Sequence, residues 1–190
     1  PAGVEAARVI ALTGRGEGSD GGGSEAEAEG VTDARAYLRR ALASGSPRIR
    51  SQAGIALTSL PADPSLDEAL RQALEAEQDD EVKLQLARAV LQRHPDDEAA
   101  VTALEEVMQG DREMAAVQAA SVLAERGDDG ALARLRETLD SEEALLRRVA
   151  ARSLARDAMR PDEVRALLGD DDAIARLYAA GGILAAASHA

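Results

Sequence analysis

Apolar positions recur along the chain with the spacing of a helix face. A nine-residue pattern is apolar at its first, fifth, eighth and ninth positions with few lapses. Its copies end at Leu12, Leu57, Val90, Leu123, Leu154 and Ile183. From Leu57 onward the copies are 33, 33, 31 and 29 residues apart. Such a stripe predicts an amphipathic helix rather than a strand, in which apolar residues would occupy every second position.

A second helix is predicted before each of the last five copies. It is marked by two long apolar residues four positions apart, which share one helix face. The pairs are Leu38 and Leu42, Leu70 and Leu74, Leu104 and Met108, Leu135 and Leu139, and Val164 and Leu168. The step from the second member of a pair to the end of the next copy is 15 residues in four cases and 16 in one. This constant step predicts units of helix, tight turn and helix.

Residues that begin helices stand where these units need them. Asp and Ser side chains accept hydrogen bonds from free first-turn amides, and proline fits there without losing an amide bond. The first helices follow Thr32-Asp33, Asp63-Pro64, Asp96-Asp97, Asp128-Asp129 and Pro161-Asp162. The second helices follow Ser46-Pro47, Asp79-Asp80, Asp111, Ser141 and Asp170 to Asp172. We interpret the acidic doublets as caps, because none shows the alternating ligands and closing Glu of a calcium loop.

The pattern predicts five units within residues 32–190. They cover residues 32–60, 63–94, 96–126, 128–158 and 161–187. Residues 1–13 carry a copy without its first helix and are predicted to be half of a truncated or capping unit. Residues 14–31, rich in Gly, Ser and Glu, are predicted to form a flexible loop. The apolar C-terminal segment GGILAAASHA lacks a polar outer face, so either self-association through the uncapped ends or a continuing chain is expected.

The units resemble HEAT repeats, specifically the short bacterial HEAT-like repeats first named from phycobiliprotein lyases. Those repeats combine an acidic turn, Val-Arg, two variable residues and Ala-Ala-x-Ala-Leu. The Val-Arg element is clearest at residues 49–50, 82–83 and 146–147, weaker at 175–176 and absent at 115–116. The resemblance implies a right-handed α-solenoid whose second helices line the concave side and whose stacked units share one continuous core.

Composition agrees with an all-α fold. Hydrophobic residues make up 45% of the chain, yet 42 of its 190 residues are Ala, and Phe, Trp and Cys are absent. Ala leads the helix propensity scale and lets helices approach closely. No Val-, Ile- or Thr-rich run with period two supports a sheet. The lack of Cys excludes disulfides and thiolate catalysis.

The net charge of −13 opposes binding to nucleic acids and to anionic membranes, both of which depend on Lys and Arg. It is compatible with a basic protein partner, although solubility is the simpler interpretation. No apolar run approaches the roughly 20 residues that span a bilayer, and no signal peptide is visible, so we expect a cytoplasmic protein. Because the chain begins at Pro1 rather than Met, the sequence leaves room for a native N-terminus upstream.

No catalytic, cofactor-binding or metal-binding residues are predicted, and we expect the protein not to be an enzyme. The HEAT-like deoxyhypusine hydroxylases carry repeated His-Glu pairs as iron ligands, whereas neither His94 nor His189 precedes Glu. The HEAT-like alkylpurine glycosylases use aromatic residues in a basic cleft, whereas Tyr37 and Tyr178 are the only aromatic residues here. The glycine cluster in residues 14–30 lacks the Lys-Ser/Thr of a phosphate-binding loop.

A column of basic residues occupies the second position of the pattern. Its members are Arg50, Lys83, Arg147 and Arg176. The structural interpretation, which follows the resemblance, is a ladder in which they bridge to acidic turn residues and tie adjacent units together. The functional interpretation is a basic surface that recruits acidic peptides or carboxyl groups. Ala116 interrupts the column and weakens both interpretations.

A partner-binding surface is predicted from the third and fourth positions of the pattern. The candidates are Gln52, Leu84, Gln85, Val117, Gln118 and Leu177. With positions one, five and eight in the core, position three is expected to face solvent on the concave side. An apolar patch beside carboxamides is typical of an interface core. The alternative is that these aliphatic residues pack on neighbouring second helices.

The sequence thus favours a protein–protein interaction scaffold or adaptor that is a segment of a larger protein. The alternative is a non-catalytic ligand-binding or enzyme accessory module that uses the concave groove. A closed pocket with convergent polar groups would favour the ligand-binding module, and an open surface would favour the scaffold.

Overall fold

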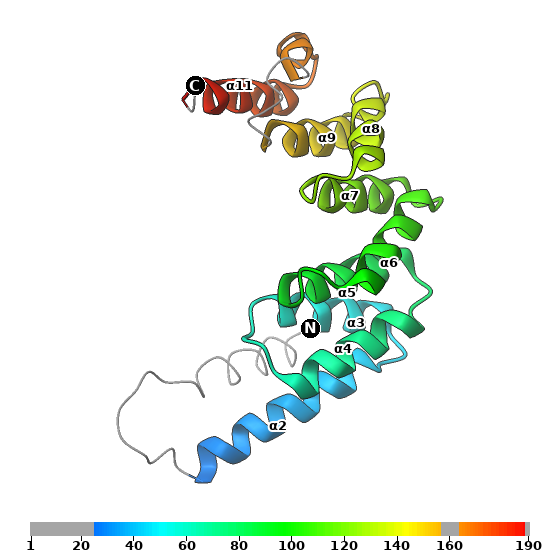
Figure 1. Ribbon diagram of the computed structural model, residues 1–190, viewed down its shortest axis with the longest axis vertical. Coiled ribbons are helices and arrows are strands. Elements are labelled where there is room, and N and C mark those ends of the chain that lie inside the picture. Colours follow the sequence, from blue (N-terminus) through cyan, green and yellow to red (C-terminus); the bar gives the residue numbers. More distant parts are fainter. Residues whose placement is uncertain (1–24, 157–163, 189–190) are drawn as a thin grey trace. The chain divides into compact units, whose positions relative to one another are not determined.

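Every regular element in the described part of the chain is helical. The computed structural model describes residues 25–156 and 164–188, which Figure 1 draws in colour. In chain order the elements are α2 (Glu25–Leu42), α3 (Pro47–Thr58), α4 (Pro64–Ala76), α5 (Asp80–Arg93), α6 (Glu98–Gln109), α7 (Glu113–Ala124), α8 (Asp129–Thr138), α9 (Ala144–Arg156), the 3-10 helix η1 (Ala166–Gly169) and α11 (Ala173–Ser188). No strand occurs in these two ranges, which confirms the predicted all-α class.

The helices follow one another as pairs joined by short turns. The predicted unit 63–94 contains α4 and α5, the unit 96–126 contains α6 and α7, and the unit 128–158 contains α8 and α9. The half-unit predicted over residues 1–13, and residues 14–24 of the predicted loop, lie outside the described residues. Of the helices in the described ranges, none is both long and apolar enough to cross a membrane.

The first described helix begins earlier than the sequence pattern predicts. Helix α2 starts at Glu25, so the predicted loop is wrong for residues 25–31. The segment EAEAE at its start contains only Glu and Ala, which rank among the best helix formers. Helix propensity therefore extends the helix where the lack of long apolar residues suggested a loop.

In the fifth unit the first helix ends in a 3-10 turn. The prediction that Val164 and Leu168 share one buried face is wrong, because Leu168 is exposed whereas Val164 and Leu167 are buried. The residues from Ala166 to Gly169 form η1, and a 3-10 helix places residues three apart on the same side. The tighter winding therefore brings Leu167, rather than Leu168, into line with Val164.

The chain divides into two compact units, residues 1–103 and 104–190. In the first, α2 contacts α3 and α4, and α5 contacts α3 and α4. Its fully buried side chains include Leu38, Leu57, Leu70, Leu86 and Val90. In the second, α7, α8 and α9 contact one another, and α11 contacts α9 and η1. The fully buried side chains there include Leu104, Leu123, Leu135, Leu146 and Leu154.

Glycine permits close helix contacts at one position in each of the two compact units. A Cβ atom on Gly54 of α3 would lie 2.9 Å from Leu86 Cδ2 of α5. A Cβ atom on Gly182 of α11 would lie 2.7 Å from Ala155 Cβ and 2.8 Å from the Ala155 carbonyl oxygen on α9. All three distances are shorter than a normal van der Waals contact, so α3 packs on α5, and α9 on α11, with almost no space between the helices.

Candidate functional site

The predicted partner-binding residues differ in exposure, and two of them are core residues. The prediction that Leu84 and Val117 face solvent is wrong, because these side chains are 2% and 0% exposed. Gln52, Gln85 and Gln118 are half-buried, and Leu177 is 67% exposed. Helix α5 contacts both α3 and α4, and α7 contacts both α8 and α9. The third position of the nine-residue pattern is therefore buried in α5 and α7, because each of these helices has neighbouring helices on more than one side.

Arg50 links the first pair of helices to the turn of the second pair. Its Nε and Nη2 atoms donate to Glu77 Oε2 and Oε1 at 2.6 and 2.8 Å. Its Nη1 atom donates to the Ser44 carbonyl oxygen at 2.9 Å. Glu77 Oε1 also accepts from the backbone amides of Gln78 and Asp79 at 2.9 and 3.0 Å. All three nitrogen atoms of this guanidinium are therefore engaged inside the protein.

Arg147 makes the same kind of link in the compact unit of residues 104–190. Its Nε and Nη2 atoms donate to Asp170 Oδ2 and Oδ1 at 3.0 and 3.1 Å. Its Nη1 atom donates to the Ser141 carbonyl oxygen at 2.9 Å, six residues back as in the Arg50 link. Arg176 Nη1 donates to the carbonyl oxygens of Asp170 and Asp171 at 2.6 and 3.0 Å.

These contacts are those of the structural interpretation of the basic column. The guanidiniums of Arg50 and Arg147 bind carboxylates in the turn of the following helix pair. Lys83 lies half-buried on α5. Because Arg50 and Arg147 already use their donors on internal acceptors, they have little capacity left to recruit carboxyl groups of another molecule.

Asp63 and one residue from each acidic cluster cap helices. Asp63 accepts from the Ser65 and Leu66 amides at 3.0 and 3.3 Å. The carboxylates of Asp79, Asp97, Asp128 and Asp172 accept from first-turn amides in the same way. Asp172 also forms a bidentate pair with Arg148, and this contact, together with the amides, lowers the pKa of Asp172.

The pair of Arg50 and Glu77 predicts how stability changes in acid. The hydrogen bonds from Arg50 hold the pKa of Glu77 below its ordinary value, despite opposing burial. The unfolded chain therefore takes up a proton first, and the stabilisation present at neutral pH is lost as pH falls from about 4.3 through the lowered pKa. We expect a Glu77→Gln variant to be less stable than wild type at pH 7, and the difference to vanish in acid. Urea unfolding followed by circular dichroism from pH 7 to pH 3 measures this.

The matched control is Glu75→Gln, because Glu75 is an exposed carboxylate two residues earlier, in the last turn of α4. It is expected to change stability by less than about 0.5 kcal/mol at pH 7. A Glu77→Gln deficit that stays constant down to pH 3 would contradict the proposed role of the charge.

A buried ion pair in the compact unit of residues 1–103 was not predicted from the sequence. Arg93 at the end of α5 pairs through Nε with Asp67 Oδ1 of α4, and both side chains are almost completely buried. Its Nη1 atom donates to the carbonyl oxygens of Leu57 and Leu60 at 3.0 and 2.8 Å. Its Nη2 atom donates to the Pro61 carbonyl oxygen at 3.0 Å. One guanidinium thus joins α4 and α5 to the C-terminal end of α3.

His94 belongs to the same cluster. Its Nε2 atom lies 3.3 Å from Asp67 Oδ2, and its side chain is 35% exposed. The signal in the sequence was Asp67 itself, a charged residue between Leu66 and Leu70 on an apolar helix face, since a buried carboxylate requires a cationic partner.

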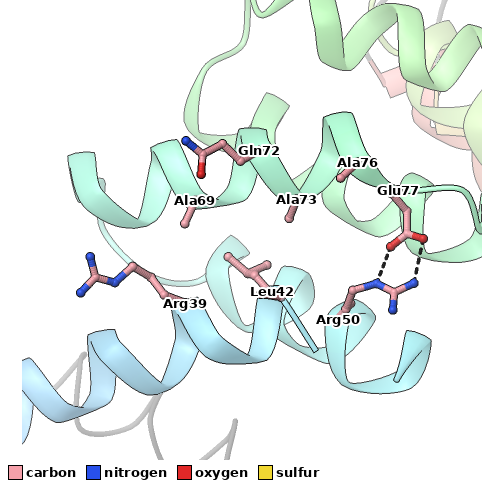
Figure 2. Close-up of a pocket in the computed structure, with 9 residues that line it drawn as sticks. Arg39, Leu42, Arg50, Ala69, Gln72, Ala73, Ala76 and Glu77 are labelled. Carbon is pink, nitrogen blue, oxygen red and sulfur yellow. Dashed lines mark hydrogen bonds and ion pairs between the residues drawn. The ribbon is translucent and has the colours of Figure 1, made fainter. Parts of the chain in front are cut away.

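A groove of about 460 Å³ lies between α2 and α4. It is lined by Arg39, Leu42, Ala43, Arg50, Ala69, Gln72, Ala73, Ala76 and Glu77. The alanines of α4 are spaced by four and three residues and share one face, and Leu42 lies opposite them in Figure 2. Of the lining residues only Leu42 and Glu77 are buried, so the groove is open to solvent.

Charge is distributed unevenly along the groove. Figure 2 shows the bidentate pair of Arg50 and Glu77 at one end and the Arg39 guanidinium at the other. Arg39 is exposed, and among the described residues no carboxylate lies within ion-pair distance of its guanidinium. Gln72 Nε2 donates to Glu68 Oε1, one turn earlier on α4, at 2.8 Å. The groove therefore has an apolar floor, one neutralised end and one cationic end.

This groove was not predicted, because the candidate binding residues lie on the second helices of the units, whereas the groove is lined mainly by α2 and α4. The only signal was the spacing of Ala69, Ala73 and Ala76, which places three small side chains on one face of a first helix. Small residues on one helix give a groove only if the neighbouring helix leaves that face open.

Comparison with known proteins gives no relative that could assign a role. No protein-family model matches the chain, and no curated protein matches it. Among solved structures it is similar to the crystal structure of an engineered protein, with 19% sequence identity over 97% of this chain and 90% of the other. The TM-score of that match is 0.48.

Proposed function

We propose that the protein is a protein–protein interaction scaffold, built as a right-handed solenoid of HEAT-like helix pairs, and that it binds a partner through the groove between α2 and α4. Two features support the solenoid. The helix pairs follow one another with a constant step along the chain, and Arg50 and Arg147 make equivalent links to the turn of the next pair. Stacked repeats of this kind commonly offer extended binding surfaces.

The open groove is the observation that carries the proposal. Its floor is apolar, its rim is polar, and seven of its nine lining residues remain exposed or half-buried. An apolar surface with a polar rim is the arrangement of a protein interface. A groove without a roof suits a partner that brings its own covering surface.

A ligand-binding or enzyme accessory module is the second candidate. The groove volume of about 460 Å³ falls within the range of about 300–1,000 Å³ that is usual for small-molecule pockets. Such pockets bury at least about 70% of the ligand surface, however, and the exposed walls here favour a macromolecule.

Site-specific photo-crosslinking tests the proposal. A photoreactive phenylalanine analogue replaces Gln72 in the groove, and a second protein carries it at Arg88, an exposed residue of α5 outside the groove. In cells of the source organism we expect a discrete protein adduct from position 72 and none from position 88. The substitution Ala73→Leu, which fills the groove, is expected to abolish the adduct.

Adducts that form equally at both positions, or that persist in the Ala73→Leu protein, would overturn the groove as the binding surface. A groove-dependent adduct of small mass, with no attached protein, would favour the ligand-binding module instead.

A further inference from the structure

We propose that the groove binds an amphipathic helix of a partner protein, which places a large apolar side chain on the alanine floor and a carboxylate against Arg39. This inference rests on the proposed function and specifies the chemistry of the partner. It follows from three properties of the groove: the shape of its floor, the state of its charges and the helical nature of its walls.

The floor leaves room for side chains larger than its own. Three of the α4 residues that line it are alanines, and Leu42 of α2 is buried beneath. The chain contains no Phe or Trp, and neither of its two Tyr residues lines the groove. A partner that inserts a bulky apolar residue would remove both surfaces from water, which is the main source of interface affinity.

The charges select a carboxylate. Glu77 is neutralised by Arg50 and by two backbone amides, so that end of the groove holds neither a free cation nor a free anion. Arg39 at the other end is the one lining charge without an ion-pair partner among the described residues. A guanidinium binds a carboxylate in charge-assisted, often bidentate, geometry.

The net charge of −13 does not cancel this preference. At physiological ionic strength, charges separated by more than about 8 Å are largely screened. A carboxylate that reaches Arg39 is therefore affected mainly by this one guanidinium. The long-range field lowers the rate of encounter with an acidic partner more than it weakens the contact itself.

The walls favour a helix as the bound segment. Both are helices, so neither provides the unpaired backbone groups that bind an added strand. Arg39 and Leu42 are three residues apart on α2, which is about one helical turn or 5 Å. A partner helix that contacts both should carry its acidic residue and its apolar anchor three or four positions apart, since these share one helix face.

The test selects peptides against the full 190-residue chain. The probe is a phage-displayed library of 16-residue, alanine-based helices randomised at four positions on one face. Selected peptides are measured by fluorescence anisotropy. We expect them to pair a large apolar residue with Glu or Asp three or four positions away. We expect Arg39→Ala to weaken binding about fivefold, because an exposed ion pair contributes up to about 1 kcal/mol.

Arg40→Ala is the matched control, because Arg40 is the adjacent exposed cation of α2 and does not line the groove. It is expected to leave the dissociation constant unchanged within about twofold at 150 mM salt. Replacing the acidic residue of the peptide with Gln should weaken binding to the wild type about fivefold and leave binding to the Arg39→Ala protein unchanged. Circular dichroism checks that every variant retains its helix content.

The outcomes separate this inference from the proposed function. In one outcome, selected peptides fail to bind the Ala73→Leu protein and yet bind the Arg39→Ala protein as well as the wild type. This result would overturn the contact between a partner carboxylate and Arg39, and it would leave the groove as a docking surface. Binding that is unaffected by Ala73→Leu, or a selection that yields no helical binder, would overturn both. Peptides that match α2 or α4, together with a dimer by light scattering, would identify a second copy of this chain as the occupant and overturn the acidic partner.

Discussion

Replacement of Arg93 by Ala is expected to lower the free energy of unfolding by about 3–5 kcal/mol, the usual cost of breaking a buried ion pair. The substitution leaves Asp67 as a buried carboxylate whose remaining neighbour is His94. It also removes the donors from three carbonyl oxygens at the C-terminal end of α3. Because small proteins unfold with only about 5–15 kcal/mol, the loss should be visible as a large shift of the urea midpoint.

The matched control is Arg88→Ala, an exposed arginine on the same helix, which is expected to change stability by less than about 0.5 kcal/mol. Arg93→Lys should fall between the two, because a single ammonium retains the charge but cannot reach all four acceptors. The paired substitution Arg93→Met with Asp67→Leu should recover much of the loss, since it leaves no unpaired charge. Equal effects of Arg93→Ala and Arg88→Ala would refute the structural role of the pair.

The substitution Gly182→Ala, which adds a methyl group, should lower the free energy of unfolding of the compact unit 104–190 by about 2 kcal/mol. The new Cβ would lie 2.7 and 2.8 Å from Cβ and Cα of Ala155, and the backbone of α9 would have to move. Overpacking of this kind costs up to about 3 kcal/mol, whereas alanine gains about 1 kcal/mol over glycine in a helix. The steric cost therefore outweighs the gain in helix propensity.

The neighbouring glycine provides the control. A Cβ atom on Gly181 would meet no other atom within 4 Å, so Gly181→Ala keeps the propensity gain without the clash. We expect it to raise the free energy of unfolding by about 0.5–1 kcal/mol. Urea unfolding monitored at 222 nm measures both variants. If Gly182→Ala is as stable as Gly181→Ala, α9 and α11 are not in close contact at this position.

The helical content could be predicted because its causes are local. Apolar spacing, alanine content and capping residues all act within a few positions along the chain, and helices α3 to α9 lie where these signals place them. The start of α2 was predicted incorrectly because Glu and Ala signal a helix by propensity, without long apolar side chains. The exposure of Leu168 arose from a change of helix type, which apolar spacing alone does not specify.

The residues of the candidate site could not be predicted from the sequence, because their exposure and pairing depend on which helices surround them. The apolar stripe of α5 shows which face is buried against one neighbour, but the contacts of α5 with both α3 and α4 bury Leu84 as well. The partner of Asp67 lies 26 residues away, and many Arg residues in the chain could have filled that role.

The sequence by itself determined the all-α class, the order of the helices and five acidic caps, because each depends on chemistry within one or two turns. These caps are Asp63, Asp79, Asp97, Asp128 and Asp172. Only the tertiary structure decided that Leu84 is core, that Arg93 rather than another arginine neutralises Asp67, and that a groove opens beside Arg39. The physical reason is that burial and pairing are properties of a side chain's whole environment. A helix face is closed or open according to how many neighbouring helices pack around it, and this is set by contacts between residues distant in the chain.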